Sequence, residues 1–152
     1  MMDHSALAES LFRQGYNCSQ AVLAAFGDVT GLAPDTALRL ASSFGGGMGR
    51  LREVCGAVTG MFMAAGLLYG YADPSDSAAK TAHYQRIQEL ARAFQAENGS
   101  IVCRELLGLD CKADSPTPAA RTADYYQKRP CQELVGCAAR ILDAYIREHP
   151  VT

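Results

Sequence analysis

Six cysteines are the residues of this chain whose chemistry is most able to carry a function. They are Cys18, Cys55, Cys103, Cys111, Cys131 and Cys137. No two of them are separated by two residues, so the chain lacks a thioredoxin-type CxxC pair, and it also lacks the local spacing of a zinc finger or an iron–sulfur loop. Any site that combines several of these thiols must therefore be assembled by the fold from distant segments.

Four of these cysteines share one kind of position. Each is expected in the first turn of a different helix, and they are Cys18, Cys55, Cys103 and Cys131. A first turn has free backbone N–H groups and the positive end of the helix dipole, which stabilise a thiolate by about 0.3 to 1 kcal/mol. For one cysteine alone, packing as a small apolar residue explains the position better. The placement shared by all four favours a functional role.

Electrostatics limits what these four thiols could form if they meet. Two thiolates about 4 Å apart repel each other by about 4 kcal/mol at an effective dielectric constant near 20, which exceeds the gain from the helix dipole several-fold. Such a cluster must therefore keep its protons, form disulfides, or bind a cation such as zinc or an iron–sulfur cluster. The residues leave these alternatives open.

A glycine-rich turn, GGGMG, precedes the central apolar segment. It follows an expected helix and no Lys-Ser or Lys-Thr pair comes after it, so it is neither a P-loop nor a dinucleotide-binding loop. We interpret its glycines, together with the glycine after the second cysteine, as positions where the backbone passes close to the cysteine site; a plain flexible turn fits equally well. The glycines concerned are Gly45, Gly46, Gly47, Gly49 and Gly56.

The other ionisable residues give weaker signals. His83 lies on the inward face of an expected helix, where a lone histidine is more often a core residue than a ligand or a proton shuttle. Glu53 is expected to be a solvated loop charge. His4 and His149 lie near the two ends of the sequence and form no cluster.

The elements that position these residues are expected to be helices. β-branched residues are sparse and never alternate with polar ones, so we predict an all-α fold, with one domain over residues 1–152 that forms a compact bundle of about six or seven helices. The helices are expected at about residues 3–14, 17–26, 34–43, 54–72, 76–97, 100–108 and 130–147, with loops at 27–31 and 110–120. In the helix at 76–97 the core side is marked by Ala79, His83, Ile87, Leu90 and Phe94.

The uncharged, Gly/Ala-rich segment 54–72 is predicted to be the central helix of this bundle. Its two small-xxx-small spacings, Gly56–Gly60 and Gly66–Gly70, also occur in membrane-spanning helices and would allow a homodimer. The neighbouring helices have apolar faces that need a partner, so we expect segment 54–72 to be a core helix that is buried on all sides, and we expect no membrane span.

Composition excludes some functions and indicates a compartment. The chain has 152 residues and a net charge of −2, without long runs of one sign, so a nucleic-acid surface or a polybasic membrane patch is not expected. The first residues lack the basic and apolar regions of a signal peptide, which favours the cytoplasm, where cysteines stay reduced.

Four blocks of the sequence resemble a known family. They are NCSQAVL (17–23), FGGGMGRLREVCGAVTG (44–60), GSIVCRELLG (99–108) and CQELV (131–135). They are similar to the bacterial and archaeal family of redox-active proteins that is named for its C…GCAxxG…C…C pattern. Where the family name has Gly-Cys-Ala, this chain has Cys55, Gly56 and Ala57, which we take as the same element.

The resemblance implies a redox role, and it carries the four cysteines of the family onto Cys18, Cys55, Cys103 and Cys131. In one hypothesis they cycle between thiol and disulfide, or ligate a redox metal or an iron–sulfur cluster, and exchange electrons with an unknown redox partner. In the alternative, the chain is a non-redox helical binding protein with a structural zinc ion or no metal.

Two cysteines lie outside the family pattern. Cys137 is expected to be a packing residue, because it lies on a different face of the last helix from Cys131. Cys111 follows the expected helix at 100–108 and is a weaker candidate for a resolving thiol of Cys103.

Overall fold

The computed structural model describes residues 2–110 and 113–151. Within these residues the chain forms helices and no strand, and one isolated bridge pairs Val54 with Val102. The helices are α1 (His4–Arg13), α2 (Cys18–Ala25), α3 (Gly27–Thr30), α4 (Pro34–Ala41), α5 (Gly45–Met48), α6 (Gly56–Tyr69), α7 (Ser77–Asn98), α8 (Cys103–Leu107), α9 (Ala123–Lys128) and α10 (Cys131–Glu148), and a 3-10 turn η1 (Ser42–Phe44) joins α4 to α5. The predicted all-α fold is confirmed.

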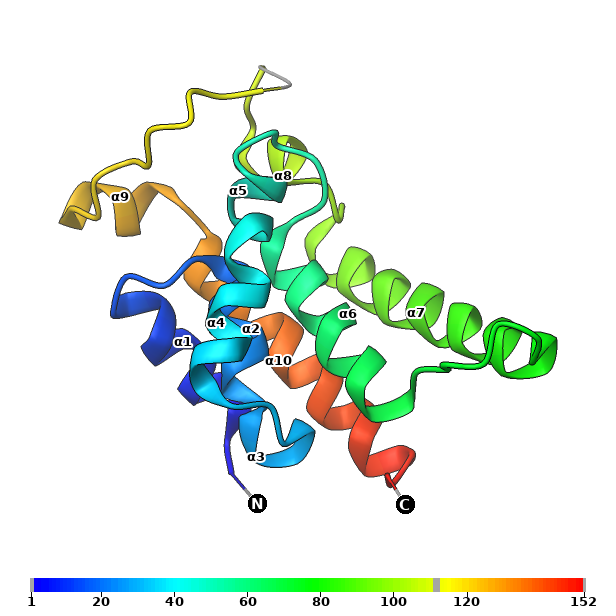
Figure 1. Cartoon of the computed structure of the whole chain (residues 1–152). Coiled ribbons are helices and arrows are strands. Elements are labelled where there is room, and N and C mark those ends of the chain that lie inside the picture. Colours follow the sequence, from blue (N-terminus) through cyan, green and yellow to red (C-terminus); the bar gives the residue numbers. More distant parts are fainter. Residues whose placement is uncertain (1, 111–112, 152) are drawn as a thin grey trace.

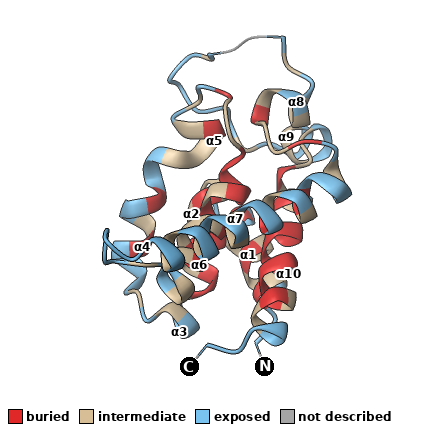
Figure 2. Cartoon of the chain, turned by 90° about the vertical axis from the view of Figure 1, so that its right-hand side faces the viewer, coloured by how far each residue is buried: buried red, intermediate tan, exposed pale blue. Residues whose placement is uncertain are grey.

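The core of the bundle lies between α2, α6 and α10. Helix α1 packs along α10, α2 packs against α6 and α4, and α10 also contacts α6 and α7, as Figure 1 shows. Buried residues gather on α6 and α10, whereas α7 is largely exposed (Figure 2). The largest fully buried side chains include Phe12, Phe26, Met61 and Phe94. They come from different helices, so the elements share one apolar core.

Glycines let α6 approach α2 closely. A Cβ atom built on Gly60 would lie 2.7 Å from the carbonyl oxygen of Ser19, so the first small-xxx-small spacing is used for packing inside the chain. A Cβ atom on Gly66, in the second spacing, would meet no described atom within 4 Å. The first spacing therefore serves helix–helix packing, whereas Gly70 of the second spacing ends α6 against the carbonyl oxygen of Gly66.

Helix α6 is shorter than the predicted 54–72, and it is not buried on all sides. Leu67 is 49% exposed, and Phe62 and Met63 are only partly buried, because α2, α7 and α10 cover only part of the helix circumference. Within residues 2–110 and 113–151, every helix is too short or too polar to cross a lipid bilayer.

Only the C-terminal half of α7 belongs to the core. Leu90 and Phe94 are buried, whereas the predicted core positions Ala79, His83 and Ile87 are half-buried. Figure 1 shows the N-terminal half of α7 projecting away from the bundle. The apolar stripe identifies one face of the helix, but it does not show how far the neighbouring helices extend along that face.

Two short helices lie where the sequence predicted a loop or no element. Helix α3 lasts about one turn and ends at Gly31, which has a left-handed conformation. Helix α9 is capped by Thr122, whose side chain accepts a hydrogen bond from the N–H of Tyr125. Helices of one or two turns are too short to show a periodic apolar pattern.

Candidate functional site

All residues of the predicted site line one cavity. The cavity has a volume of about 270 Å³ and lies where the starts of α2, α6, α8 and α10 meet. Its wall contains Cys18, Cys55, Cys103 and Cys131, together with Gly45, Gly46, Gly47, Gly49 and Gly56. The fold therefore gathers thiols from four distant segments around one space.

Each of these cysteines lies at the start of a helix. Cys18, Cys103 and Cys131 are the first residues of α2, α8 and α10, and Cys55 is the residue that precedes α6. Free backbone N–H groups of four helix starts are consequently close to the cavity. Such groups favour a thiolate over a thiol, although the effect at each start is small.

Local side-chain hydrogen bonds precede or cap two of these helices. At α2 the predicted capping box is present: the side chain of Asn17 accepts from the N–H of Gln20 at 2.9 Å, and the side chain of Gln20 accepts from the N–H of Asn17 at 3.0 Å. The start of α8 differs from the prediction. Ser100 is not its cap, because the Ser100 hydroxyl accepts from the N–H of Val102 at 2.9 Å and closes a tight turn, so that the helix begins at Cys103.

Backbone pairing holds Cys55 beside Cys103. The N–H of Cys55 donates to the carbonyl of Ile101 at 2.8 Å, and the N–H of Cys103 donates to the carbonyl of Glu53. These two bonds flank the isolated bridge of the fold. Two segments that are distant in sequence therefore run side by side just before α6 and α8 begin.

The glycine-rich segment forms a left-handed helical turn. Residues 46–50 all have positive φ, between 59 and 68°. Glycine adopts this conformation without steric cost, whereas each of Met48 and Arg50 stores roughly 1–2 kcal/mol of strain. Strained backbone of this kind is concentrated at functional sites, and here it forms part of the cavity wall.

Two glycines are needed because the cysteines lie against them. A Cβ atom on Gly47 would lie 2.6 Å from the Cβ of Cys103, and a Cβ atom on Gly56 would lie 3.0 Å from the Cβ of Cys18. Any side chain at these positions would displace the cysteine or the backbone. The glycines therefore let the main chain pass close to the thiols.

Cys18 and Cys131 shift the pKa of each other in opposite directions. Hydrogen bonding from the Cys18 thiol lowers the pKa of Cys131 to about 7 against the opposing effect of burial; Arg129 and the Tyr125 hydroxyl also favour this thiolate. The interaction with Cys131, and then burial, raise the pKa of Cys18 well above its ordinary value. Of the two thiols, Cys131 is therefore the one that ionises more readily.

Cys55 and Cys103 favour the protonated form. Burial raises the pKa of Cys55 to about 12, although the backbone N–H groups of Ala57 and Val58 stabilise its thiolate. Burial also raises the pKa of Cys103, and the guanidinium of Arg52, whose Nη1 lies 3.5 Å from the sulfur, offsets part of this effect. The cluster avoids the repulsion of several thiolates by ionising at one position.

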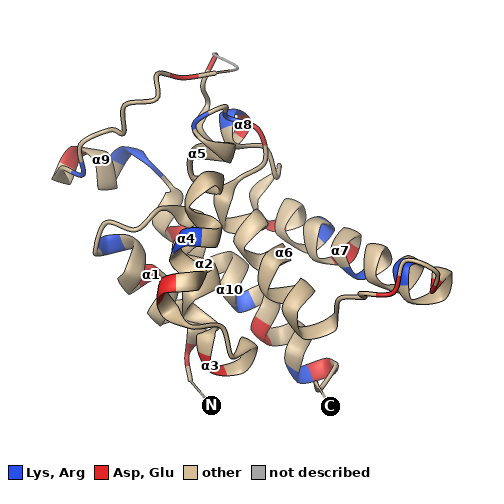
Figure 3. Cartoon of the chain, in the orientation of Figure 1, with Lys and Arg blue, Asp and Glu red and all other residues tan. Residues whose placement is uncertain are grey.

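Four arginines line the same cavity, and its described lining contains no carboxylate. They are Arg50, Arg52, Arg121 and Arg129. Figure 3 shows these basic segments beside α8 and between α9 and α10. Asp114, behind the wall, binds Arg50 at 3.2 Å and Arg52 at 2.9 Å. The cavity is therefore electropositive.

Sequence reasoning missed these arginines and Tyr125. Arg121, Arg129 and Tyr125 come from segments without periodicity or motif, and the surface loops of any protein contain arginines. Two local signals existed: Arg50 and Arg52 lie in the block 44–60 that resembles the family, and Arg129 adjoins the Pro130–Cys131 helix start. Their common position appears only when the segment before α10 folds back over the starts of α2 and α8.

The remaining cysteines lie elsewhere. Cys137 does not line the cavity; it is buried on α10, and Asn98 Nδ2 lies 3.4 Å from its sulfur. Cys111, the weaker candidate for a resolving thiol, lies outside the described residues. The cysteines that the structure describes are all free thiols. Among the described side chains, no three His, Cys, Asp or Glu residues are arranged to hold a metal ion.

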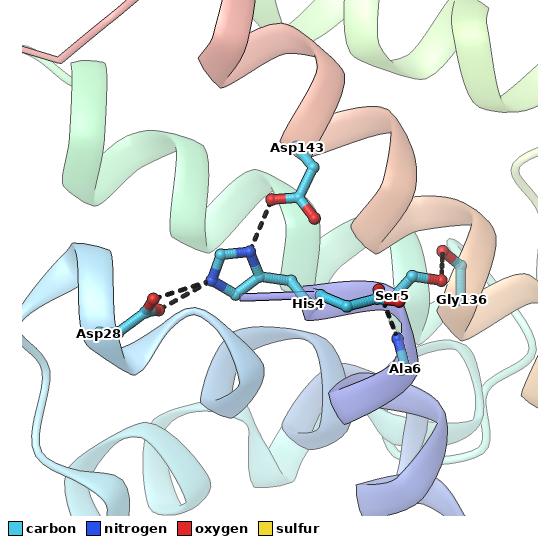
Figure 4. Close-up of polar contacts among 7 residues, drawn as sticks. His4, Ser5, Ala6, Asp28, Gly136 and Asp143 are labelled. Atoms are coloured by element: carbon cyan, nitrogen blue, oxygen red, sulfur yellow. Dashed lines mark hydrogen bonds and ion pairs between the residues drawn. The ribbon is translucent and has the colours of Figure 1, made fainter. Parts of the chain in front are cut away.

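Three other candidates lie outside the cysteine cavity. Glu53 is a loop charge, as expected, with its side chain 46% exposed, and its carboxylate pairs with Arg104 at 3.1 Å. His83 is half-buried on the projecting part of α7 and lies 3.0 Å from Arg86 Nη1, away from the cavity. His4, which was assigned to no cluster, is buried between two aspartates of α3 and α10 (Figure 4).

The fold and the site define a helical bundle whose cysteines surround an electropositive cavity. The model of the family described as "Putative redox-active protein (C_GCAxxG_C_C)" matches residues 16–145, a span that contains all four cavity cysteines. The chain belongs to this family. No curated protein and no solved structure matches the chain.

Proposed function

We propose that this family member is a thiol–disulfide redox protein in which Cys131 is the attacking thiolate and Cys18 is the resolving thiol. The observation that carries the proposal is that Cys18 and Cys131, the first residues of α2 and α10, line one open cavity. Each thiol shifts the pKa of the other, which supports their proximity, and neighbouring sulfurs can form a disulfide. The lowered pKa of Cys131 supports its role as the nucleophile.

The proposed reaction is balanced by a disulfide substrate, which is the oxidant. The Cys131 thiolate attacks one sulfur of the substrate, forming a mixed disulfide and releasing the first substrate thiolate. Cys18 then loses its proton to solvent or to that thiolate, and attacks the Cys131 sulfur. The second substrate thiolate leaves as the Cys18–Cys131 disulfide forms. Two electrons pass from the protein dithiol to the substrate, and an external thiol reductant restores the dithiol.

A soft metal ion or an iron–sulfur cluster on the same four cysteines is the second candidate. It is favoured by the presence of all four thiols on one cavity wall. Within the described chain, no three of these donors are arranged for a single ion, so binding would require the helix starts to move closer together. The alternative of a structural zinc ion in a binding protein has the same requirement.

Trapping a mixed disulfide tests the first candidate. We expect the Cys18→Ser variant, treated with glutathione disulfide, to hold one glutathione on Cys131 as measured by mass spectrometry of the intact chain and its peptides. The parent chain should instead form the internal disulfide. Cys137→Ser is the matched control and should behave like the parent chain. If Cys18→Ser holds no glutathione, or holds it mainly on Cys55 or Cys103, the assignment of the two roles is wrong.

Anaerobic purification separates the two candidates. Elemental analysis and a visible spectrum of the untreated chain should show no stoichiometric iron or zinc if the dithiol reaction is its function. A brown protein with iron and sulfide, lost in Cys131→Ser, would favour the cluster. A colourless chain with one zinc ion and no thiol loss on mild oxidation would favour the binding protein.

The proposed dithiol form also has a cellular requirement. A resting pair of thiols persists where the surroundings are reducing, and cysteines that are not in disulfides are typical of the cytoplasm. We therefore propose the cytoplasm as the location of this protein.

A further inference from the structure

The charge of the cavity constrains what can react at Cys131. Four guanidinium groups line it, and the described lining has no Asp or Glu side chain. One carboxylate, Asp114, serves both Arg50 and Arg52, while Arg121 and Arg129 take part in no ion pair within the described chain. The single thiolate of Cys131 does not balance this charge. Unbalanced positive charge around a cavity attracts anions and raises their local concentration.

Arg52 has hydrogen-bonding capacity that the described chain does not use. Its side chain is buried, with the residue 2% exposed, and its Nε is the buried side-chain nitrogen that has no hydrogen-bond partner among the described residues. Leaving a buried donor without a partner costs about 1–3 kcal/mol, and more when the group is charged. Such a donor in a cavity wall suits an acceptor that arrives with a ligand.

Arg121 is held in position without a carboxylate. Its Nη1 donates to the carbonyl of Phe12 at 2.9 Å and its Nη2 donates to the carbonyl of Tyr16 at 3.0 Å. Its guanidinium also lies 4.1 Å from the centroid of the Phe12 ring. The positive charge is therefore fixed at the wall before any ligand binds, so little side-chain entropy is lost on binding.

The size and the remaining wall of the cavity limit the ligand further. A volume of about 270 Å³ lies just below the range of roughly 300–1,000 Å³ that is typical of small-molecule sites. Part of the wall is apolar, with Leu106, Leu134 and Pro118. A small organic molecule with an apolar section and anionic ends fits these features better than the disulfide of a folded protein.

We propose that the substrate of the cavity is a small disulfide that carries carboxylate groups close to its sulfurs. This inference rests on the proposed exchange at Cys131 and follows the same two steps, in which the substrate disulfide is reduced to two thiols. The arginines bind the carboxylates through paired N–H donors and place one substrate sulfur in front of Cys131. They also stabilise the thiolates that leave.

Three matched disulfides test the inference. They are the dianion 3,3′-dithiodipropionate, the neutral bis(2-hydroxyethyl) disulfide and the dication cystamine. The second-order rate constant of the reduced chain with each probe is divided by that of free 2-mercaptoethanol, which corrects for the intrinsic reactivity of the probe. We expect this ratio to be about tenfold or more higher for the dianion than for the neutral probe, and lowest for the dication. Added salt should reduce the difference.

Arginine variants show whether the cavity causes the preference. Arg129→Gln should lower the preference for the dianion over the neutral probe by about threefold or more, and Arg129→Lys should retain most of it. A general loss of Cys131 reactivity would slow both probes equally and would leave the preference unchanged. Arg39→Gln is the control, because Arg39 lies on α4 outside the cavity and its side chain is 83% exposed.

Each outcome has one interpretation. Equal ratios for the dianion and the neutral probe would overturn this inference and leave the exchange reaction intact. An unchanged preference in Arg129→Gln together with Arg121→Gln would also overturn it. If none of the three probes oxidises the chain, the proposed exchange itself is wrong, and the inference is lost with it.

Discussion

Helix α10 contributes to two buried polar clusters that differ in whether their polar atoms have hydrogen-bond partners. Its first residue, Cys131, lines the cysteine cavity, and Asp143 further along the helix binds His4. Figure 1 shows α5 and α8, whose residues line the cavity, at one end of the bundle and α3, whose Asp28 binds His4, near the other end. Both clusters bury ionisable side chains, so burial alone does not distinguish a structural cluster from a reactive one.

In the His4 cluster every polar atom of the ring has a partner. His4 is 2% exposed, its Nδ1 lies 2.6 Å from Asp143 Oδ1, and its Nε2 lies 2.8 Å from Asp28 Oδ1 (Figure 4). Each ring nitrogen therefore faces a carboxylate oxygen. The ring also stacks on Phe26, with the centroids 4.3 Å apart. This cluster joins α1, α3 and α10 and leaves nothing for a ligand to satisfy.

The cysteine cavity, by contrast, contains an unpaired buried donor, strained backbone and perturbed thiols. Arg52 Nε has no partner in the described chain, residues 46–50 are in a left-handed conformation, and Cys131 and burial raise the pKa of Cys18 well above its ordinary value. These features cost stability and are retained where they serve binding or reaction. The comparison indicates that the His4 cluster contributes stability and the cavity contributes reactivity, and each can be altered separately.

The largest expected effect is the loss of reactivity in Cys131→Ser. We expect the rate of exchange with a small disulfide to fall by more than about a hundredfold, because a hydroxyl cannot replace the thiolate. The free energy of unfolding should change by less than about 1 kcal/mol, since serine is close in volume to cysteine. Rates are followed by thiol release and stability by urea unfolding. Cys137→Ser should retain the rate; an equal loss in both variants would contradict the assignment of the reactive thiol to Cys131.

The converse variant, His4→Ala, should lose stability and keep reactivity. Removing the ring leaves the buried Asp143 carboxylate, whose residue is 8% exposed, without its partner, which should cost about 3 kcal/mol in the free energy of unfolding. Exchange rates measured well below the unfolding transition should stay within about twofold of the parent chain. His83→Ala, on the projecting part of α7, is the control and should cost less than about 1 kcal/mol.

A slower exchange in a folded His4→Ala chain would show that the two ends of α10 are coupled. A double variant with Asp143→Ala sharpens the result. It should be destabilised by less than the sum of the two single variants, because the second change removes a carboxylate that has already lost its partner.

Two glycines of α6 test the packing between the clusters. Gly60→Ala should destabilise the chain by about 2 kcal/mol, because the added Cβ would lie 2.7 Å from a backbone oxygen of α2 that cannot move freely. Gly66→Ala in the same helix meets no described atom within 4 Å and should stabilise the chain by about 0.5 to 1 kcal/mol. Urea unfolding of both variants gives the comparison. A dimer that uses Gly66 would reverse the second sign and make it depend on protein concentration.

Helix positions and thiols were predictable because both leave local signals. Asn17 and Gln20 mark the start of α2, and a cysteine at a helix start can be recognised without knowing the fold. Of the predicted inward positions of α7, Leu90 and Phe94 are buried and Ile87 packs against the core, whereas Ala79 and His83 are only half-buried, since one apolar stripe does not show how far the neighbouring helices extend. The short helices α3 and α9 depend on single caps and left no periodic pattern.

The partners of the thiols could not be predicted because they are brought in by long-range contacts. Arg121 reaches the carbonyls of Phe12 and Tyr16, and Asp114 reaches Arg52, across large separations in sequence. The His4 cluster was missed for the same reason: the aspartates that bind its ring are far from it in the chain. The sequence shows which groups could react, whereas their charge balance depends on how the helices are assembled.

The smallest expected effect concerns how strongly Cys18 stabilises the Cys131 thiolate. The hydrogen bond from Cys18 holds the pKa of Cys131 at about 7, so the thiolate is the main form above this pH and is lost as the pH falls through it. The alkylation rate of Cys131 should therefore rise through a midpoint near pH 7. In Cys18→Ala the donor is absent, and the midpoint should move up by about one unit, which slows alkylation about tenfold on the acidic side.

Mass spectrometry of the Cys131 peptide after timed iodoacetamide treatment measures this midpoint. Cys55→Ala is the control, because Cys55 lines the same cavity but makes no hydrogen bond to Cys131, and its midpoint should stay close to that of the parent chain. A midpoint that stays near pH 7 in Cys18→Ala would mean that Arg129, Arg121 and Tyr125 stabilise the thiolate without the second sulfur. The other groups of the cavity would then stabilise the Cys131 thiolate without Cys18, just as the two aspartates bind both ring nitrogens of His4. The remaining difference between the two clusters would be the unpaired Nε of Arg52 and the strained turn at residues 46–50.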